Sequence, residues 1–163
     1  MFVEGAKILV KSNGLYLPVE ELDAGDTFFD PLVRRYCTIT RVMSRRLELT
    51  PIKENDTHPL RPILFSAGSL NGTLPKFDVA VSPMQRVMVN WKYSDLGSSR
   101  EMRLELAKNA ALLESEQYLL GNKEANYFAI FTHGSRFMDV AGLLMQTYDA
   151  EIYINSALES RFS

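Results

Sequence analysis

Short runs of β-forming residues, each ended by turn-forming residues, occupy most of this chain of 163 residues. The first run, Ala6 to Lys11, ends at Ser12-Asn13-Gly14, and Asn-Gly tolerates the positive φ angles of tight turns. The returning run, Leu15 to Val19, contains Pro18, which has no backbone N–H to donate and therefore favours the edge of a sheet. An acidic stretch from Glu20 to Asp26 follows as a turn or a single helical turn. This pattern predicts an all-β first half.

The rest of the chain continues this pattern, with one exception. We expect further strands at Tyr36 to Arg41, Arg46 to Ile52, Phe77 to Val81, Arg86 to Trp91, Tyr127 to Phe131, Phe137 to Ala141 and Glu151 to Ile154. The exception is Ser98 to Glu116, which has no Gly or Pro and is rich in helix formers. Leu104, Ala107 and Ala111 fall on one side of this predicted helix, so we expect that side to pack on the sheet. The fold class predicted is mainly β with one helix in the second half.

Length and composition favour one globular domain over residues 1–163, with 46% hydrophobic and 23% charged residues. The formal net charge is −2, and the basic pairs Arg34-Arg35 and Arg45-Arg46 are expected to be solvated. We therefore expect no nucleic-acid partner. No segment approaches the roughly 18 apolar residues of a membrane helix, so we expect no membrane partner. The N-terminus lacks the pattern of a signal peptide, which predicts synthesis in the cytoplasm.

Residues suited to metal binding are few. A single cysteine, Cys37, excludes an internal disulfide and a thiolate-rich metal site, and only His58 and His133 supply imidazole. Asp23, Asp26 and Asp30 do not have the spacing of a calcium loop. We therefore expect no metal and no cofactor.

Three separated stretches resemble the bacterial Hint domain family, the hedgehog and intein self-processing fold, in the family's order. The first runs from Phe2-Val3-Glu4-Gly5-Ala6-Lys7-Ile8 to Pro18-Val19-Glu20-Glu21-Leu22-Asp23-Ala24-Gly25-Asp26. The second runs from His58-Pro59-Leu60-Arg61-Pro62-Ile63, through Ala67-Gly68-Ser69-Leu70, to Leu74-Pro75-Lys76-Phe77-Asp78-Val79-Ala80-Val81-Ser82-Pro83. The third and weakest spans Tyr127 to Tyr148, centred on Ala141-Gly142-Leu143. Together they cover nearly the whole chain, and the resemblance implies a pseudo-symmetric, mainly β Hint-like fold.

The resemblance also implies a self-processing chemistry whose residues this chain lacks. In that chemistry, a Cys, Ser or Thr at the first position attacks the preceding carbonyl, and a histidine assists at the scissile amide. Met1 stands at the nucleophile position and has no proton to lose, and Gln85 stands at the histidine position. A chain that starts at Met1 would also have no upstream peptide to cleave. The family's Asp-Arg-His signature is replaced by His133-Gly134-Ser135.

Other candidate catalytic residues have less support. Cys37 lies within a strand-like run, which favours a buried structural thiol over a nucleophile. His133 is expected to be a surface imidazole in a turn, and a Ser135/His133 pair has no third group to orient it. Aromatic residues near the C-terminus, Tyr148, Tyr153 and Phe162, are suited either to packing against another chain or to ordinary core and edge positions.

We therefore expect a non-catalytic Hint-like domain with a structural or protein-interaction role. Its expected partner is another protein or a second copy of the chain, in an assembly such as a phage-like or gene-transfer particle. The alternative is a self-cleaving Hint peptidase with a non-standard nucleophile, for which Cys37, His133 and Ser135 are the candidates. A small-molecule-binding or sterol-like regulatory domain is a third reading with no dedicated feature in the sequence.

Overall fold

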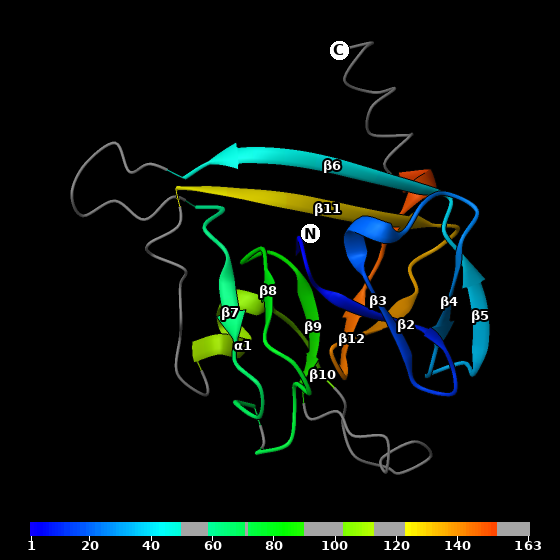
Figure 1. The fold of residues 1–163 in the computed structure, drawn as a ribbon, viewed down its shortest axis with the longest axis horizontal. Coiled ribbons are helices and arrows are strands. Elements are labelled where there is room, and N and C mark those ends of the chain that lie inside the picture. Colours follow the sequence, from blue (N-terminus) through cyan, green and yellow to red (C-terminus); the bar gives the residue numbers. More distant parts are fainter. Residues whose placement is uncertain (50–58, 71, 90–102, 113–122, 153–163) are drawn as a thin grey trace.

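The computed structural model describes residues 1–49, 59–70, 72–89, 103–112 and 123–152. Strands dominate these residues (Figure 1). The strands are β1 (Phe2–Val3), β2 (Lys7–Lys11), β3 (Leu15–Pro18), β4 (Thr27–Asp30), β5 (Arg35–Thr38), β6 (Arg41–Glu48), β7 (Ile63–Phe65), β8 (Val79–Val81), β9 (Arg86–Val89), β10 (Arg103–Leu106), β11 (Glu124–Thr132), β12 (Phe137–Val140), β13 (Leu143–Gln146) and β14 (Tyr148–Asp149). A 3-10 turn, η1 (Val19–Glu21), and a short helix, α1 (Ala107–Leu112), complete the named elements. The mainly β fold class with a helix in the second half is confirmed.

The strands form two larger sheets and one hairpin. One sheet has the order β14-β11-β1-β8-β7, and β6 also pairs with β11. The other has the order β10-β9-β13-β12-β2-β3, while β4 and β5 pair only with each other. Strand β1 pairs with both β8 and β11, so the start of the chain is held between segments far away in the sequence.

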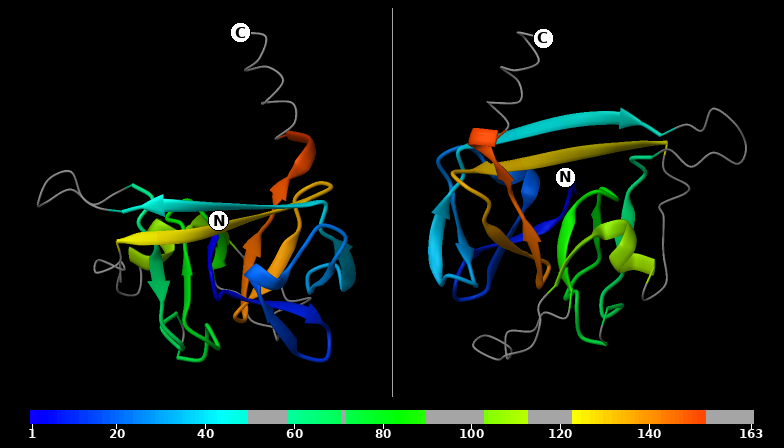
Figure 2. Two further views of the ribbon diagram at one scale, coloured as in Figure 1. Left: turned by 45° about the horizontal axis from the view of Figure 1, so that its top comes forward. Right: turned by 180° about the vertical axis from the view of Figure 1, so that it is seen from behind.

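The longest pairing joins β6 and β11, which lie antiparallel from Arg41 opposite Phe131 to Glu48 opposite Glu124. Figures 1 and 2 show these two strands crossing the molecule as one ribbon, from the β4–β5 hairpin toward β7. The buried side chains of Leu47 and Tyr127 form a small core beneath one end of the ribbon. The main core combines side chains from both larger sheets and from the β4–β5 hairpin, and it contains fully buried residues such as Ile8, which stabilise the fold by about 1.5–3 kcal/mol each.

Several expected elements are confirmed. Gly14 has a φ of 98° and donates its N–H to the Lys11 carbonyl at 3.0 Å, as the Asn-Gly turn requires. Strand β3, which contains Pro18, is the last strand of its sheet. The expected run from Tyr36 to Arg41 is divided, however, because β5 ends at Thr38 and β6 begins at Arg41.

The predicted helix from Ser98 to Glu116 is wrong over part of its length. Residues Arg103–Leu106 form strand β10, which pairs antiparallel with β9, and the helix begins only at Ala107. Pairing satisfies the backbone groups of β9, and this tertiary gain outweighs the helix propensity of the segment. Residues 98–102 and 113–116 lie outside the described residues.

The predicted strand from Glu151 to Ile154 is also wrong where the structure describes it. Residues 150–152 are helical, and the Asp149 carboxylate accepts the Glu151 N–H at 2.9 Å. An acidic side chain that accepts a backbone N–H of the first turn favours a helix start at this position. Residues 153–163, with Tyr153 and Phe162, lie outside the described residues.

Candidate functional site around residue 1

The first residue is held in place by the strand that follows it. Phe2 lies opposite both Val81 and Phe128, so β1 places residue 1 beside the turn that follows β8. The Ser82 N–H donates to the Met1 carbonyl at 2.9 Å. The backbone of residue 1 is therefore fixed against the Ser82-Pro83-Met84-Gln85 turn.

The backbone nitrogen of Met1 has two side-chain partners. It donates to Gln85 Oε1 at 2.7 Å, and it lies 3.1 Å from Tyr148 Oη. Burial lowers the pKa of this α-amine from 8.0 to about 5, so the amine is neutral at pH 7. Burial also raises the pKa of Tyr148, whose hydroxyl therefore keeps its proton. A neutral amine can donate to Gln85 and accept from Tyr148 at the same time.

Gln85 uses both ends of its side-chain amide. Its side chain is 2% exposed, and Nε2 donates to the Gln146 carbonyl at 2.9 Å and to the Arg86 carbonyl at 3.2 Å. Two backbone acceptors on one end and the Met1 nitrogen on the other settle which amide atom is oxygen. Neither end of the amide is left to serve as a proton donor toward a carbonyl.

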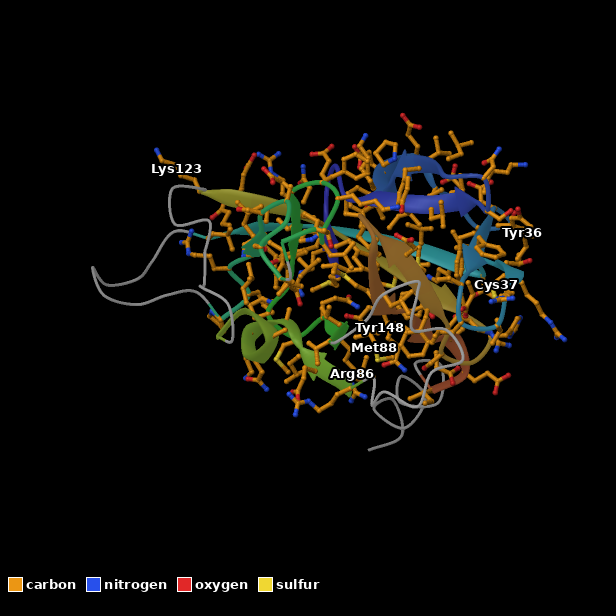
Figure 3. The ribbon with its side chains drawn as sticks, turned by 90° about the horizontal axis from the view of Figure 1, so that it is seen from below. Tyr36, Cys37, Arg86, Met88, Lys123 and Tyr148 are labelled. Carbon is orange, nitrogen blue, oxygen red and sulfur yellow. The ribbon has the colours of Figure 1, made fainter. Side chains whose placement is uncertain are left out.

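A pocket of about 370 Å³ opens beside this turn. It is lined by Met84, Gln85, Arg86, Phe131, Ser135, Gln146, Thr147, Tyr148, Asp149 and Ile152. Arg86 of β9 and Tyr148 of β14 both line the pocket, and both are labelled in Figure 3. Three lining residues are large, apolar and exposed: Met84 at 51%, Tyr148 at 38% and Ile152 at 67%. Part of the rim is therefore apolar, next to the exposed Arg86 and Ser135, whereas the Gln85 side chain is buried and fully paired.

A buried pair of hydroxyls holds the turn between β11 and β12 beside this pocket. Thr132 Oγ1 and Thr147 Oγ1 are 2.7 Å apart, and Thr147 Oγ1 also accepts the Arg136 N–H at 2.9 Å. These bonds attach the β11–β12 turn to the end of β13. They also determine where His133 and Ser135, which lie within the turn, are presented.

A family model for the Hint domain matches residues 1–151. The chain belongs to the Hint domain family. No curated protein matches it. The sequence resemblance assigned the Hint nucleophile and histidine positions to Met1 and Gln85, and the structure brings these two residues into hydrogen-bond contact. Tyr148 is the third group at this centre, and no feature of the sequence indicated that it would approach residue 1.

The other candidate residues of this Hint domain do not meet at one centre. Ser135 is exposed and lines the pocket beside Gln85, whereas His133 lines a different pocket. His133 is an exposed imidazole in a bend, as expected, with Nδ1 4.0 Å from the Glu151 carboxylate. Among the described contacts, no hydrogen bond joins His133 to Ser135.

Cys37 lies on β5, away from Tyr148 (Figure 3). Its thiol is half-buried, not fully buried as expected, because it faces the same pocket as His133. Burial and the nearby Asp30 carboxylate raise the pKa of this thiol, against the opposing effect of Arg136 and Arg35. A raised pKa leaves little thiolate at neutral pH, which makes Cys37 a weak nucleophile.

Two of the three aspartates considered as cation ligands, Asp26 and Asp30, use their carboxylates to accept backbone N–H groups. Asp26 accepts the Asp23 N–H at 2.8 Å. The buried carboxylate of Asp30 accepts N–H groups from Leu32 at 2.9 Å and Phe137 at 3.2 Å. Within the described residues, no group of three His, Cys, Asp or Glu side chains could hold a metal ion, and no helix could span a membrane. His58 lies outside the described residues.

Proposed function

We propose that this Hint domain is non-catalytic and acts as a structural or protein-interaction module. The observation that carries the proposal is the contact between Met1 and Gln85 at the processing centre of the family. The acyl shift of Hint processing needs a hydroxyl or thiol on residue 1, and the Met1 thioether has no proton to lose. It also needs a proton donor at the scissile amide, and the Gln85 amide does not transfer a proton near neutral pH.

The surface around this centre supports an interaction role. Met84, Tyr148 and Ile152 expose apolar area around the pocket, and exposed apolar patches of this kind are typical of protein contacts. The assembly that we propose is a larger particle, such as a phage-like or gene-transfer particle. In this proposal, the domain keeps the Hint fold without the self-processing residues, and its function depends on the proteins that it contacts in the assembly.

The first experiment tests catalysis by intact-mass analysis of fusion proteins. A folded reporter protein is placed upstream of residue 1 in the unchanged chain, in M1C, in Q85H and in the double variant M1C/Q85H. We expect the unchanged fusion to keep its full mass after prolonged incubation with dithiothreitol. The double variant, which regains a thiol and an imidazole, is the control in which cleavage at residue 1 is expected. Cleavage of the unchanged fusion would contradict the proposal.

The alternative, a self-cleaving peptidase, has one observation in its favour. Ser135 supplies a hydroxyl to the same pocket as Gln85. If the unchanged fusion is cleaved, Ser135→Ala should abolish the cleavage, whereas Cys37→Ala should leave it intact. This result would replace the non-catalytic proposal with a serine-dependent one.

The second experiment tests the interaction surface. Met84→Asp and Ile152→Asp place a charge on the apolar part of the rim, whereas Leu15→Asp changes another exposed apolar residue, on β3. In size-exclusion chromatography with the native particle or partner fraction, we expect both rim variants to lose co-elution and Leu15→Asp to retain it. Equal behaviour of the three variants would exclude this surface.

A further inference from the structure

A second pocket, of about 660 Å³, lies between the β4–β5 hairpin and the β11–β12 turn. It is lined by Val33, Arg35, Tyr36, Cys37, Thr38, Thr132, His133 and Arg136. The hairpin and the turn are far apart in the sequence, and Asp30 joins them because its carboxylate accepts the Phe137 N–H at 3.2 Å. Arg35, opposite Asp30 in the hairpin, and Arg136, next to Phe137, therefore face the same cavity.

The charges of this pocket are one-sided. Arg35 and Arg136 line it beside the His133 imidazole, and no carboxylate of the described part of the chain does. The Asp30 carboxylate, which acts on the Cys37 thiol, belongs to a residue that is 1% exposed and accepts backbone N–H groups; the exposed Glu151 carboxylate lies 4.0 Å from the His133 imidazole. This concentration of positive charge stands out in a chain whose net charge is −2.

The donors of the pocket are available to a bound molecule. Within the described residues, neither guanidinium has a hydrogen bond or ion pair, and the Thr38 hydroxyl has no partner. Guanidinium groups match the planar, paired oxygens of carboxylates and phosphates, and a hydroxyl adds a neutral donor. The volume is in the range of pockets for small molecules and exceeds what a single ion needs.

We propose that this pocket binds a small ligand through a carboxylate or phosphate group placed between Arg35 and Arg136. The proposal goes beyond the structural role of the domain, since it concerns a pocket that does not include Met1 or Gln85. It holds whether or not the domain cleaves itself.

Cys37 provides a probe of the pocket because it is the single cysteine of the chain and lines the cavity. Iodoacetate and iodoacetamide alkylate the same thiolate and release iodide, but only iodoacetate carries a carboxylate. The ratio of their rate constants therefore reports the attraction for an anion and is independent of the thiol pKa. We expect this ratio to exceed that of glutathione by about fivefold, the size of one charge interaction near a surface.

Matched variants identify the charges responsible. Arg35→Gln and Arg136→Gln should each lower the ratio toward the glutathione value, whereas Arg45→Gln, which removes an exposed charge from β6, should leave it unchanged. Inorganic phosphate or succinate should slow alkylation by iodoacetamide more than chloride at equal ionic strength. Inhibition by phosphate alone would identify a phosphate site, and inhibition by succinate alone a carboxylate site.

Two results would overturn the proposal. The first is a ratio equal to that of glutathione and unaffected by Arg35→Gln and Arg136→Gln. The second result applies if Cys37 does not react with either reagent. In that case, phosphate and succinate are titrated into the protein, and the absence of saturable amide NMR shifts at Thr38 and His133 with both would overturn the proposal. Shifts produced only by an acidic peptide would also overturn it, because they would indicate a protein surface and not a small-molecule site.

Discussion

The α-amine of Met1 is a titrating group enclosed by the fold. Its pKa falls from 8.0 to about 5 because burial disfavours the charged form. The amine nitrogen lies 2.7 Å from Gln85 Oε1 and 3.1 Å from Tyr148 Oη, and both of these side chains are neutral. A charge at this position has no carboxylate partner in the hydrogen bonds that the structure describes.

This amine predicts a pH dependence of stability. Between pH 5 and pH 8 the unfolded chain binds a proton that the folded chain does not, so the free energy of unfolding falls as pH decreases through this window. The slope from this group is at most about 1.4 kcal/mol per pH unit, and its contribution is complete above pH 8. Urea denaturation at pH 5, 6, 7 and 8 measures it.

The control for this prediction removes the titrating group. An N-terminally acetylated chain has an amide at Met1 that cannot be protonated in this range, so the dependence should become shallower by up to about 1.4 kcal/mol per pH unit. If the acetylated and free chains show equal slopes, the amine is not buried as described.

At the scale of elements, the β12–β13 turn depends on two residues with positive φ. Ala141 has a φ of 54° and Gly142 a φ of 93°, and the Gly142 N–H donates to the Asp139 carboxylate at 2.7 Å. A Cβ at Gly142 would lie 2.9 Å from a Leu74 side-chain atom. The turn therefore requires glycine at position 142 for both its conformation and its space.

We predict that Gly142→Ala lowers the free energy of unfolding by about 1–3 kcal/mol, through backbone strain and the contact with Leu74. Ala141→Gly is the matched change, since it removes a Cβ from a left-handed residue in the same turn. It should be neutral or stabilise by up to about 1 kcal/mol. Urea denaturation midpoints compare the two, and a larger loss for Ala141→Gly would refute this account of the turn.

The sequence predicted those elements whose conformation depends only on neighbouring residues. The Asn13-Gly14 turn and the edge strand containing Pro18 follow from backbone limits that each residue carries into any fold. Strand β10 could not be predicted in this way, because Arg103–Leu106 have helix-forming side chains and become a strand only through pairing with β9. The helical start after Asp149 similarly depends on a single carboxylate contact.

At the scale of the whole molecule, the candidate site is assembled from three segments that are far apart in the sequence. Residue 1 meets the side chains of Gln85 and Tyr148, and Gln85 in turn contacts the Gln146 carbonyl. These contacts form because strands β1 and β14 both pair with β11 in one larger sheet, and β9 pairs with β13 in the other. The family resemblance indicated two of these residues, Met1 and Gln85. It carried no information about Tyr148, whose contact depends on the parallel pairing of β14 with β11.

The residues of the second pocket were likewise visible in the sequence, but their proximity was not. In the sequence, Arg35 belongs to a basic pair that is expected to be solvated, and Cys37 and His133 are separate candidates for catalysis. The carboxylate of Asp30 bonds to the backbone of both segments, and this contact places Arg35 and Arg136 around one cavity. Such proximity depends on long-range hydrogen bonds, which leave no periodic pattern in the sequence.

Residue types and local patterns are sufficient to predict the Hint family, the mainly β fold class, the tight turn at Asn13-Gly14 and the side chains present at positions 1 and 85. These properties depend on side-chain chemistry and local backbone limits, which are present before the chain folds. Folding brings Met1 and Gln85 into contact, adds Tyr148 to them, and places at one pocket two arginines that have no side-chain partner among the described residues. Distances between remote residues depend on strand pairing and burial, and these exist only once the sheets have formed.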